Sequence, residues 1–294
     1  MPRSTAELVG LFDLEVIEDV LFRGRQPATS LQRVFGGQVL GQALFAAART
    51  VGSRAGEPAR PVHSLHAYFL LPGDPAVPIV YDVEPLRDGG SFSSRRVAAR
   101  QHGRKIFYLT ASFQAPEPGP EHADPAPAVP PPGECPTLAE AMADSRGRAA
   151  ARAMAEEFAA LEVRHAGQVA DGRSVHAAVA RVWMRAQGPL AGDDVLHRAV
   201  LAYMSDLTLL FASLVPHGPD LAGGRVQLAS LDHAMWFHRP FRADEWLLYD
   251  QISPSASGAR GLSIGRIFDA AGRLVATAVQ EGLVRPVDPR GRAG

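Results

Sequence analysis

The 294-residue sequence contains very little cysteine and almost no lysine. Its single cysteine, Cys135, excludes an internal disulfide, so the fold is expected to rest on packing and to suit a reducing compartment. Cys135 lies in a proline-rich stretch without a neighbouring base, which favours an incidental residue over a nucleophile. Of the 30 basic side chains, only Lys105 is a lysine. Arginine binds phosphate through paired hydrogen bonds, which suits a phosphate-bearing ligand, although a coding bias explains the same excess.

Strong net charge and long apolar runs are also lacking. The formal net charge is −1, so no concentrated basic surface for nucleic acid or for an anionic membrane is expected. No uninterrupted apolar run approaches the ~18 residues that a membrane span requires, so we expect no stable membrane insertion. Residues 1–20 carry five acidic side chains, unlike the basic start and apolar middle of a secretion signal. A cytoplasmic protein is therefore the default expectation.

Proline is concentrated in one segment. Between residues 115 and 136, nine of 22 residues are proline. Because proline lacks an N–H donor and has a fixed φ, such a segment cannot pack as a helix or a central strand. We predict an extended, stiff linker. It divides the chain into an N-terminal unit, residues 1–114, and a C-terminal unit, residues 137–294.

The N-terminal unit is predicted to contain one buried helix followed by an antiparallel sheet. A short acidic helix is expected first, from Ser4 to Val16. In the helix predicted from Phe35 to Val51, nearly all residues between Val39 and Ala48 are apolar, as in a helix buried on all sides. Strand patterns separated by glycine-containing turns follow over residues 62–71, 78–86, 92–101 and 105–113. This order predicts an α+β fold.

The C-terminal unit repeats this plan. Helical patterns cover residues 138–142 and 149–161, and strands are expected at 161–165 and 175–185. A buried helix is predicted from Asp194 to Leu214, where apolar residues recur mostly every three or four positions. Further strands are expected at 226–237, 246–252, 261–268 and 274–284. The aromatic pair Tyr68-Phe69 recurs as Trp236-Phe237, a shift of 168 residues that indicates a duplicated domain.

Six blocks of sequence resemble the acyl-CoA thioesterase II family (the TesB type), and the similarity runs from about Leu8 to Arg285 except in the proline-rich segment. The blocks are Arg33–Ala43, Val62–Asp74, Ser91–Ala99, Tyr203–Leu207, Leu231–Phe241 and Val279–Gly282. The resemblance implies a double hotdog fold, in which each of two modules has a long central helix wrapped by an antiparallel β-sheet. It implies an acyl-CoA substrate, no metal or other cofactor, and association into a homo-oligomer through the sheets.

The resemblance also implies the reaction and its catalytic residues. The family hydrolyses acyl-CoA to a free fatty acid and coenzyme A, with an Asp on the second central helix, a Thr or Ser on the next strand and a Gln on the last strand. The matching positions are Asp206, Ser230 and Gln280. In the predicted helix Asp206 flanks the apolar face, where partial desolvation would raise its pKa and strengthen it as a base towards water.

Substrate-binding residues are expected in two places. Gly36, Gly37 and Gln38, at the start of the first central helix, allow close backbone approach and offer N–H groups to the thioester carbonyl. Arg95 and Arg260 are candidates for the phosphates of coenzyme A. Solvated strand charges are the alternative for both arginines.

Other patterns support competing functions. Gly261–Gly265 matches the Gly-x-Ser-x-Gly elbow of serine hydrolases, but the residues that follow indicate a strand and a hairpin instead of the required helix. His233 and His238 would point to opposite faces of a strand, which does not suit a metal site. A hotdog enoyl-CoA hydratase or dehydratase, using Asp206 with His233 or His197, is one alternative function. A non-catalytic acyl-CoA-binding protein is another. The Ser and Gln partners favour hydrolysis over both.

Overall fold

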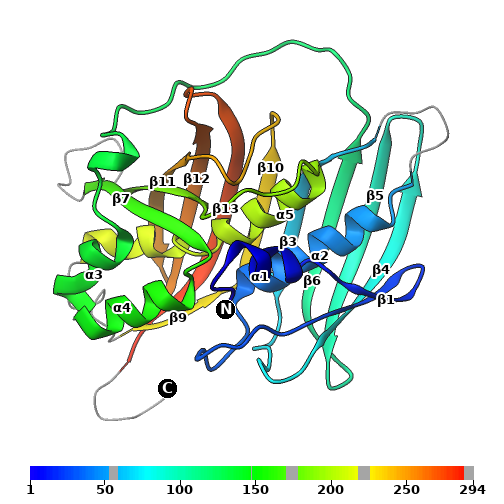
Figure 1. Cartoon of the computed structure of the whole chain (residues 1–294), viewed down its shortest axis with the longest axis horizontal. Coiled ribbons are helices and arrows are strands. Elements are labelled where there is room, and N and C mark those ends of the chain that lie inside the picture. Colours follow the sequence, from blue (N-terminus) through cyan, green and yellow to red (C-terminus); the bar gives the residue numbers. More distant parts are fainter. Residues whose placement is uncertain (53–58, 147, 170–177, 218–225, 288–294) are drawn as a thin grey trace.

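The computed structural model describes the chain except residues 53–58, 147, 170–177, 218–225 and 288–294 (Figure 1). The α-helices are α1 Thr5–Gly10, α2 Gly36–Arg49, α3 Leu138–Arg146, α4 Arg148–Glu157 and α5 Asp194–Ser205, and the 3-10 helices are η1 Pro132–Glu134 and η2 Leu209–His217. The strands are β1 Glu15–Glu18, β2 Leu21–Gly24, β3 Val62–Phe69, β4 Ile79–Asp88, β5 Phe92–Gln101, β6 Arg104–Gln114, β7 Leu161–Val169, β8 Val179–Ala186, β9 Val226–Ser230, β10 Asp232–Phe237, β11 Leu247–Ser257, β12 Arg260–Asp269 and β13 Leu274–Pro286.

The described strands form one continuous antiparallel sheet that curves around two central helices (Figure 1). Its order is β1-β2-β4-β5-β6-β3-β10-β13-β12-β11-β8-β7, with β9 attached to β13. The two halves meet where β3 pairs with β10, with His66 opposite Ala234. These two residues are themselves 168 positions apart, so the seam lies where a duplication with that shift places a local two-fold axis. The predicted double hotdog fold of class α+β is confirmed.

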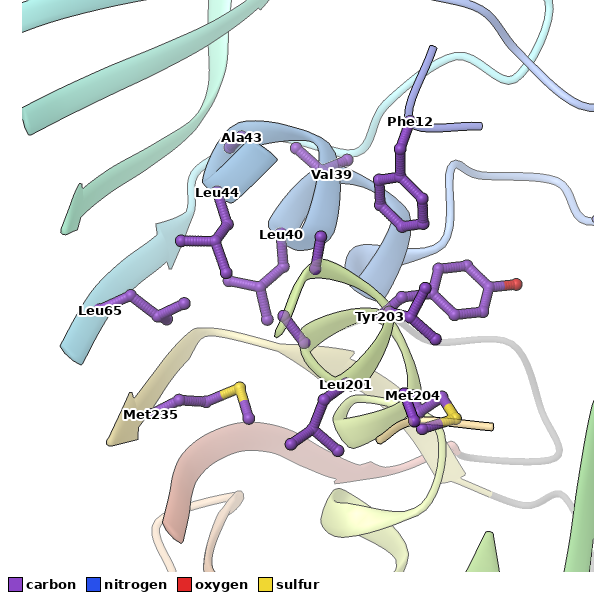
Figure 2. Packing of buried hydrophobic residues seen from close by; sticks show 14 of the residues in the cluster. Phe12, Val39, Leu40, Ala43, Leu44, Leu65, Leu201, Tyr203, Met204 and Met235 are labelled. Carbon is purple, nitrogen blue, oxygen red and sulfur yellow. The ribbon is translucent and has the colours of Figure 1, made fainter. Parts of the chain in front are cut away.

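The central helices α2 and α5 pack against each other inside the sheet and form the main core (Figure 2). Leu40 and Leu44 of α2 and Leu201 and Met204 of α5 belong to this core, together with Leu65 and Met235 from the seam strands. A methyl group added at Gly37 would lie 2.3 Å from the carbonyl oxygen of Tyr203. The helices therefore approach at a distance that only glycine permits at this position.

The proline-rich segment runs as an extended trace from the end of β6 to α3, across one end of the molecule (Figure 1). It is also held against the C-terminal half. Trp183 donates a hydrogen bond from Nε1 to the Pro130 carbonyl oxygen at 2.9 Å, and Arg266 pairs with Asp124 at 3.1 Å. Its assignment as the boundary between two modules stays a prediction.

One element at the N-terminus and one in the C-terminal half differ from the expectation. The first helix ends at Gly10, well before Val16, because β1 and β2 form a short hairpin on the edge of the sheet. In the C-terminal half, the strand expected from residue 175 begins at Val179, and residues 175–177 lie outside the described part of the chain. Helical periodicity does not distinguish the end of a short helix from a following edge strand, so the end of the first helix was predicted too late.

The second central helix is shorter than its apolar pattern predicts. The α-helix ends at Ser205, Asp206 is its C-cap with φ −81° and ψ −10°, and the chain continues through a turn into η2. Leu209, Leu210 and Leu214 of η2 remain buried. Burial continues through the break, and therefore the apolar pattern continues as well. The turn frees the Asp206 side chain from the face of a regular helix.

The strand predicted over residues 226–237 is divided at Leu231 into β9 and β10. Ser230 pairs with Gly282 and Ala234 pairs with Val279, so three residues on one strand face two on the other. This one-residue irregularity is a β-bulge, a device that bends a strand and redirects side chains. It lies beside Gln280 and Ser230.

One segment meets the length and composition of a membrane span. Residues Asp194–His217, which comprise α5, the turn and η2, have a mean hydropathy of 1.6. However, 78% of the most apolar window is buried inside the fold. A core helix of a globular protein meets the same criterion, so this observation is weak support for a membrane span.

Candidate active site

Asp206, Ser230 and Gln280 come from three separate elements and meet at one point. Gln280 donates from Nε2 to Asp206 Oδ1 at 2.5 Å and to Ser230 Oγ at 2.8 Å. Ser230 in turn donates from Oγ to the same Asp206 oxygen at 3.1 Å. The turn after α5 supplies Asp206, the end of β9 supplies Ser230, and β13 supplies Gln280. The β-bulge at Leu231 directly follows Ser230 and lies opposite the part of β13 that carries Gln280.

The N-terminus of α2 lies against the other carboxylate oxygen. The N-cap, Phe35, has no side-chain hydrogen bond to the helix, and the Gly37 N–H donates to Asp206 instead. A methyl group added at Gly36 would be 2.6 Å from Asp206 Oδ2. A carboxylate from the C-terminal half therefore caps a helix of the N-terminal half, in the field of its positive end.

Burial dominates the protonation of Asp206. Its side chain is only 4% exposed, and desolvation raises the pKa to about 6 against the opposing hydrogen bonds from Gln280, Ser230 and Gly37. Desolvation disfavours the charged form, whereas donors to the carboxylate favour it. A carboxylate with this pKa is a stronger base than an ordinary aspartate and is still mostly ionised at neutral pH.

His233 is a neighbour of Asp206 that the sequence pattern underrated. Its Nδ1 lies 4.0 Å from Asp206 Oδ1, and its Nε2 is 3.0 Å from Ser205 Oγ. The ring is fully buried, and desolvation lowers its pKa to about 3, so it is neutral. Nδ1 has no hydrogen-bond partner among the described residues. The sequence analysis paired His233 with Asp206 only for the alternative hydratase, because a strand pattern does not show how close the two residues lie.

A cavity of about 810 Å³ opens at Asp206. Gly36, Asp206 and Ser230 line it, whereas Gln280 is fully buried behind them. Most of the remaining wall is apolar and comes from the segment before α2, the β3–β4 turn, α4, η2 and β9. Its apolar residues include Val34, Phe35, Phe69, Met154, Phe158, Leu207, Leu210, Phe211 and Leu228. The site thus combines a buried carboxylate with a wall suited to a hydrocarbon chain.

The three residues expected to polarise a carbonyl are partly used by the protein. The Gly37 N–H is directed at Asp206, and the Gln38 N–H donates to the Phe35 carbonyl oxygen at 3.1 Å. The Gln38 side chain donates to Gln26 and does not line the cavity. Gly36 alone of the three lines the cavity. Its role is therefore close backbone approach to Asp206.

The two arginines predicted to bind phosphate do not lie at the cavity. Arg95 is 2% exposed and pairs with Asp88 at 2.8 Å. It also donates to Thr50, at the opposite end of α2 from Asp206. Arg260 pairs with Glu281 at 2.9 Å. Glu281 adjoins the inward-facing Gln280 on β13, so both charges lie on the outer face of the sheet.

The remaining candidates have other surroundings. His197 accepts a hydrogen bond at Nδ1 from the Ala243 N–H and lies nine residues before Asp206, about 13 Å along a helix. His238 is exposed and bonded to Thr277. Ser263, the serine of the Gly-x-Ser-x-Gly match, lies in the middle of β12, opposite Gln280. No helix follows it directly, so the nucleophile elbow is excluded here.

Comparisons with known proteins agree with this architecture. A family model described as acyl-CoA thioesterase matches residues 148–283, and one described as the acyl-CoA thioesterase N-terminal domain matches residues 25–114. A hot dog fold protein of unknown function from Alicyclobacillus acidocaldarius covers 96% of this chain and 99% of its own, with a TM-score of 0.74 at 20% identity. At that identity the match shows the fold, which places the chain among hotdog proteins.

Two closer relatives define the family. Human acyl-coenzyme A thioesterase 8 is 40% identical over 287 residues, which is 94% of this chain and 88% of that protein. The crystal structure of acyl-CoA thioesterase II TesB2 from Mycobacterium marinum is 45% identical, with a TM-score of 0.81 over 97% of this chain and all of the other. The chain therefore belongs to the acyl-CoA thioesterase II family, as the sequence blocks predicted.

Proposed function

We propose that the chain hydrolyses acyl-CoA thioesters and that Asp206 is the general base for attack by water. The observation that carries the proposal is the buried carboxylate, bonded to Ser230 and Gln280, at the wall of a largely apolar cavity. Membership in a family of thioester hydrolases supports the reaction, and the geometry supports these three residues as its centre. Hydrolysis of acyl-CoA would give the chain a role in fatty acid metabolism.

The reaction needs a base, a positioned water and a proton for the leaving sulfur. Asp206 takes one proton as the water oxygen forms a bond to the thioester carbon. Ser230 and Gln280 orient the carboxylate and the water beside it. The carbon–sulfur bond then breaks, and the protonated Asp206 returns its proton to the thiolate. Because the pKa of Asp206 is about 6 and that of a thiol is about 8.5, this last transfer is favourable.

The alternative hydratase function needs a second acid–base group that faces the substrate. His233 is close to Asp206 but is fully buried and does not line the cavity. His197 accepts its hydrogen bond from Ala243, away from Asp206. Neither ring is placed to reach the α or β carbon of a bound acyl group, and this favours hydrolysis.

The test is thiol release from short-, medium- and long-chain acyl-CoAs by the wild type and by Asp206→Asn. We expect kcat to fall by about 100-fold or more in the variant, because general-base catalysis contributes about 10²–10⁴-fold. An unchanged rate in Asp206→Asn would refute the role of the carboxylate. An absence of turnover in the wild type would refute the hydrolase, and the same samples should then be tested for enoyl-CoA hydration and for simple binding.

We propose two further properties, a location in the cell and an oligomeric state. A cytoplasmic location is supported by the single cysteine, Cys135, which suits a reducing compartment. A homo-oligomer is supported by the exposed outer face of the seam strands, where Tyr68 is 59% exposed. Light scattering of the purified chain would test the second proposal directly.

A further inference from the structure

One cationic side chain, Arg33, lines the described wall of the cavity that contains Asp206. It is exposed to solvent, and no hydrogen bond or ion pair of its guanidinium occurs within the described part of the chain. Arg95 and Arg260 differ in this respect, because each is paired with a carboxylate. Arg33 is therefore available to an anionic ligand that enters the cavity.

The backbone directly after Arg33 is held by two kinds of contact. The Val34 N–H donates to the Gly73 carbonyl oxygen at 3.0 Å. Phe35 packs edge-on against Phe158 and Tyr203, with ring centroids 5.2 Å away in both cases. The segment leads directly into Gly36, beside Asp206. Arg33 thus directly precedes a segment that is held in place beside Asp206.

The spacing suits a long ligand with its charge far from its reacting group. Three residues of extended chain span at most about 10 Å, and the arginine side chain adds several ångströms towards solvent. An acyl-CoA ester has this form, since the pantetheine arm separates the thioester from the phosphates. Gln32 and Gln227, also on the cavity wall, are exposed polar residues.

We infer that Arg33 binds a phosphate of the coenzyme A portion of the substrate, at the mouth of the cavity that holds Asp206. The inference rests on the proposed thioesterase function. Guanidinium is planar and always charged, and it donates two parallel hydrogen bonds to phosphate oxygens. Arg33 is then a binding residue that distinguishes coenzyme A esters from thioesters that lack phosphate.

The experiment compares two thioesters of the same acyl group, one of coenzyme A and one of pantetheine, which lacks the phosphates. Wild type, Arg33→Ala and Arg33→Glu are assayed on both at low and high salt. Arg152→Ala is the matched control, because Arg152 is 83% exposed and lies on α4 near Met154 of the cavity wall. It removes the same charge from the outside of the same region.

We expect kcat/KM for acyl-CoA to fall about three- to tenfold more than kcat/KM for acyl-pantetheine in Arg33→Ala, mainly through KM. The difference should be larger in Arg33→Glu, smaller at high salt and absent in Arg152→Ala. Equal losses on both thioesters, or no loss, would overturn the inference. Turnover of neither thioester by the wild type would instead overturn the proposed function.

Product inhibition provides an independent measurement and identifies the phosphate. Coenzyme A, its 3′-dephospho form and pantetheine are compared as competitive inhibitors. If Arg33 binds the 3′-phosphate, the advantage of coenzyme A over the dephospho form disappears in Arg33→Ala. If it binds the diphosphate, that advantage persists while both bind more weakly relative to pantetheine. Inhibition constants that are unchanged in Arg33→Ala would contradict the inference even if acyl-pantetheine is not hydrolysed.

Discussion

At the scale of single residues, Asp206 is subject to two opposing effects. Burial raises its pKa to about 6, while Gln280, Ser230 and the Gly37 N–H favour its charged form. The sequence placed Asp206 on the flank of an apolar helix and so predicted the desolvation. It gave no means of predicting the donors, because they come from residues 24 to 169 positions away that only the folded chain brings together. Ser230 and Gln280 were identified through the family resemblance.

The pH dependence of the rate follows from this pKa. If the Asp206 carboxylate is the base, kcat should rise with pH through about 6 and level off above it. Ser230→Ala removes a donor that lowers the pKa, so the midpoint should move to higher pH and the plateau should be lower. A pH–rate profile of both proteins checks this. A midpoint that stays in place in Ser230→Ala would argue against the hydrogen bond.

Stability should depend on pH in the corresponding direction. The folded pKa of about 6 lies above the unfolded value of 3.8, so ionisation of Asp206 destabilises the fold. The free energy of unfolding is highest below the unfolded pKa of 3.8, where Asp206 is protonated in both states. It falls by about 3 kcal/mol in total as pH rises through the folded pKa of about 6. Urea unfolding at pH 4.5 and 7.5 should therefore show Asp206→Asn gaining stability relative to the wild type as pH rises. A constant difference would contradict the raised pKa.

At the scale of secondary structure, the sequence predicted most strands and both central helices but missed the breaks that build the site. The α5–η2 turn and the bulge between β9 and β10 both occur where burial is continuous. Hydrophobic periodicity indicates only which residues are buried. The periodic pattern therefore does not change at a break between two buried elements. The position of Leu231 between two strands is set by pairing with β3 and β13, which are distant in sequence.

The close approach of α2 to α5 predicts different effects for neighbouring glycines. Gly37→Ala places a methyl group 2.3 Å from a backbone carbonyl oxygen, and we expect a loss of about 1–3 kcal/mol of stability from overpacking. Gly36→Ala crowds Asp206 Oδ2 and should reduce kcat more than stability. Gly10→Ala in α1 is the control, since nothing lies within 4 Å of the added methyl. Thermal midpoints and kcat separate the three variants, and similar behaviour of all three would disprove the packing argument.

Met154 of helix α4 and Phe158, directly after that helix, contribute to the cavity wall. Met154→Trp adds bulk there, so we expect kcat/KM for long-chain acyl-CoA to fall about tenfold relative to a short-chain substrate. Ala153→Trp is the matched control, because Ala153 is exposed on the same helix. Rates across a series of chain lengths give the result. An unaltered chain-length preference in Met154→Trp would show that the acyl group lies elsewhere.

At the scale of the whole molecule, the two halves share one sheet and one site. The β3–β10 seam and the α2–α5 contact join them, and Asp206 of one half accepts from Gly37 of the other. The sequence predicted two repeated units and the segment between them. It did not predict the seam, because pairing partners of strands are not encoded in the pattern of either strand alone.

Cleavage of the connecting segment tests this arrangement. A protease site introduced between Glu117 and Gly119, where the chain is exposed, allows the intact fold to be cut. We expect the two fragments to elute together in gel filtration with kcat within about twofold of the uncut chain, because the seam and the core remain. Protease-treated wild type without the site is the control. Fragments that separate would show that the segment itself holds the halves together.

The first half carries a different residue at the position that corresponds to Asp206. Thr50 follows α2 as Asp206 follows α5, and Thr50 is bound by the buried Arg95, itself paired with Asp88. The N-terminus of α5 is capped by its own Asp193. A homodimer of one module would have to carry the same residues at both places. Joining two modules in one chain allows these two positions to differ. One carries the buried carboxylate that we propose as the base, and the other carries a threonine bound by an arginine of a structural ion pair.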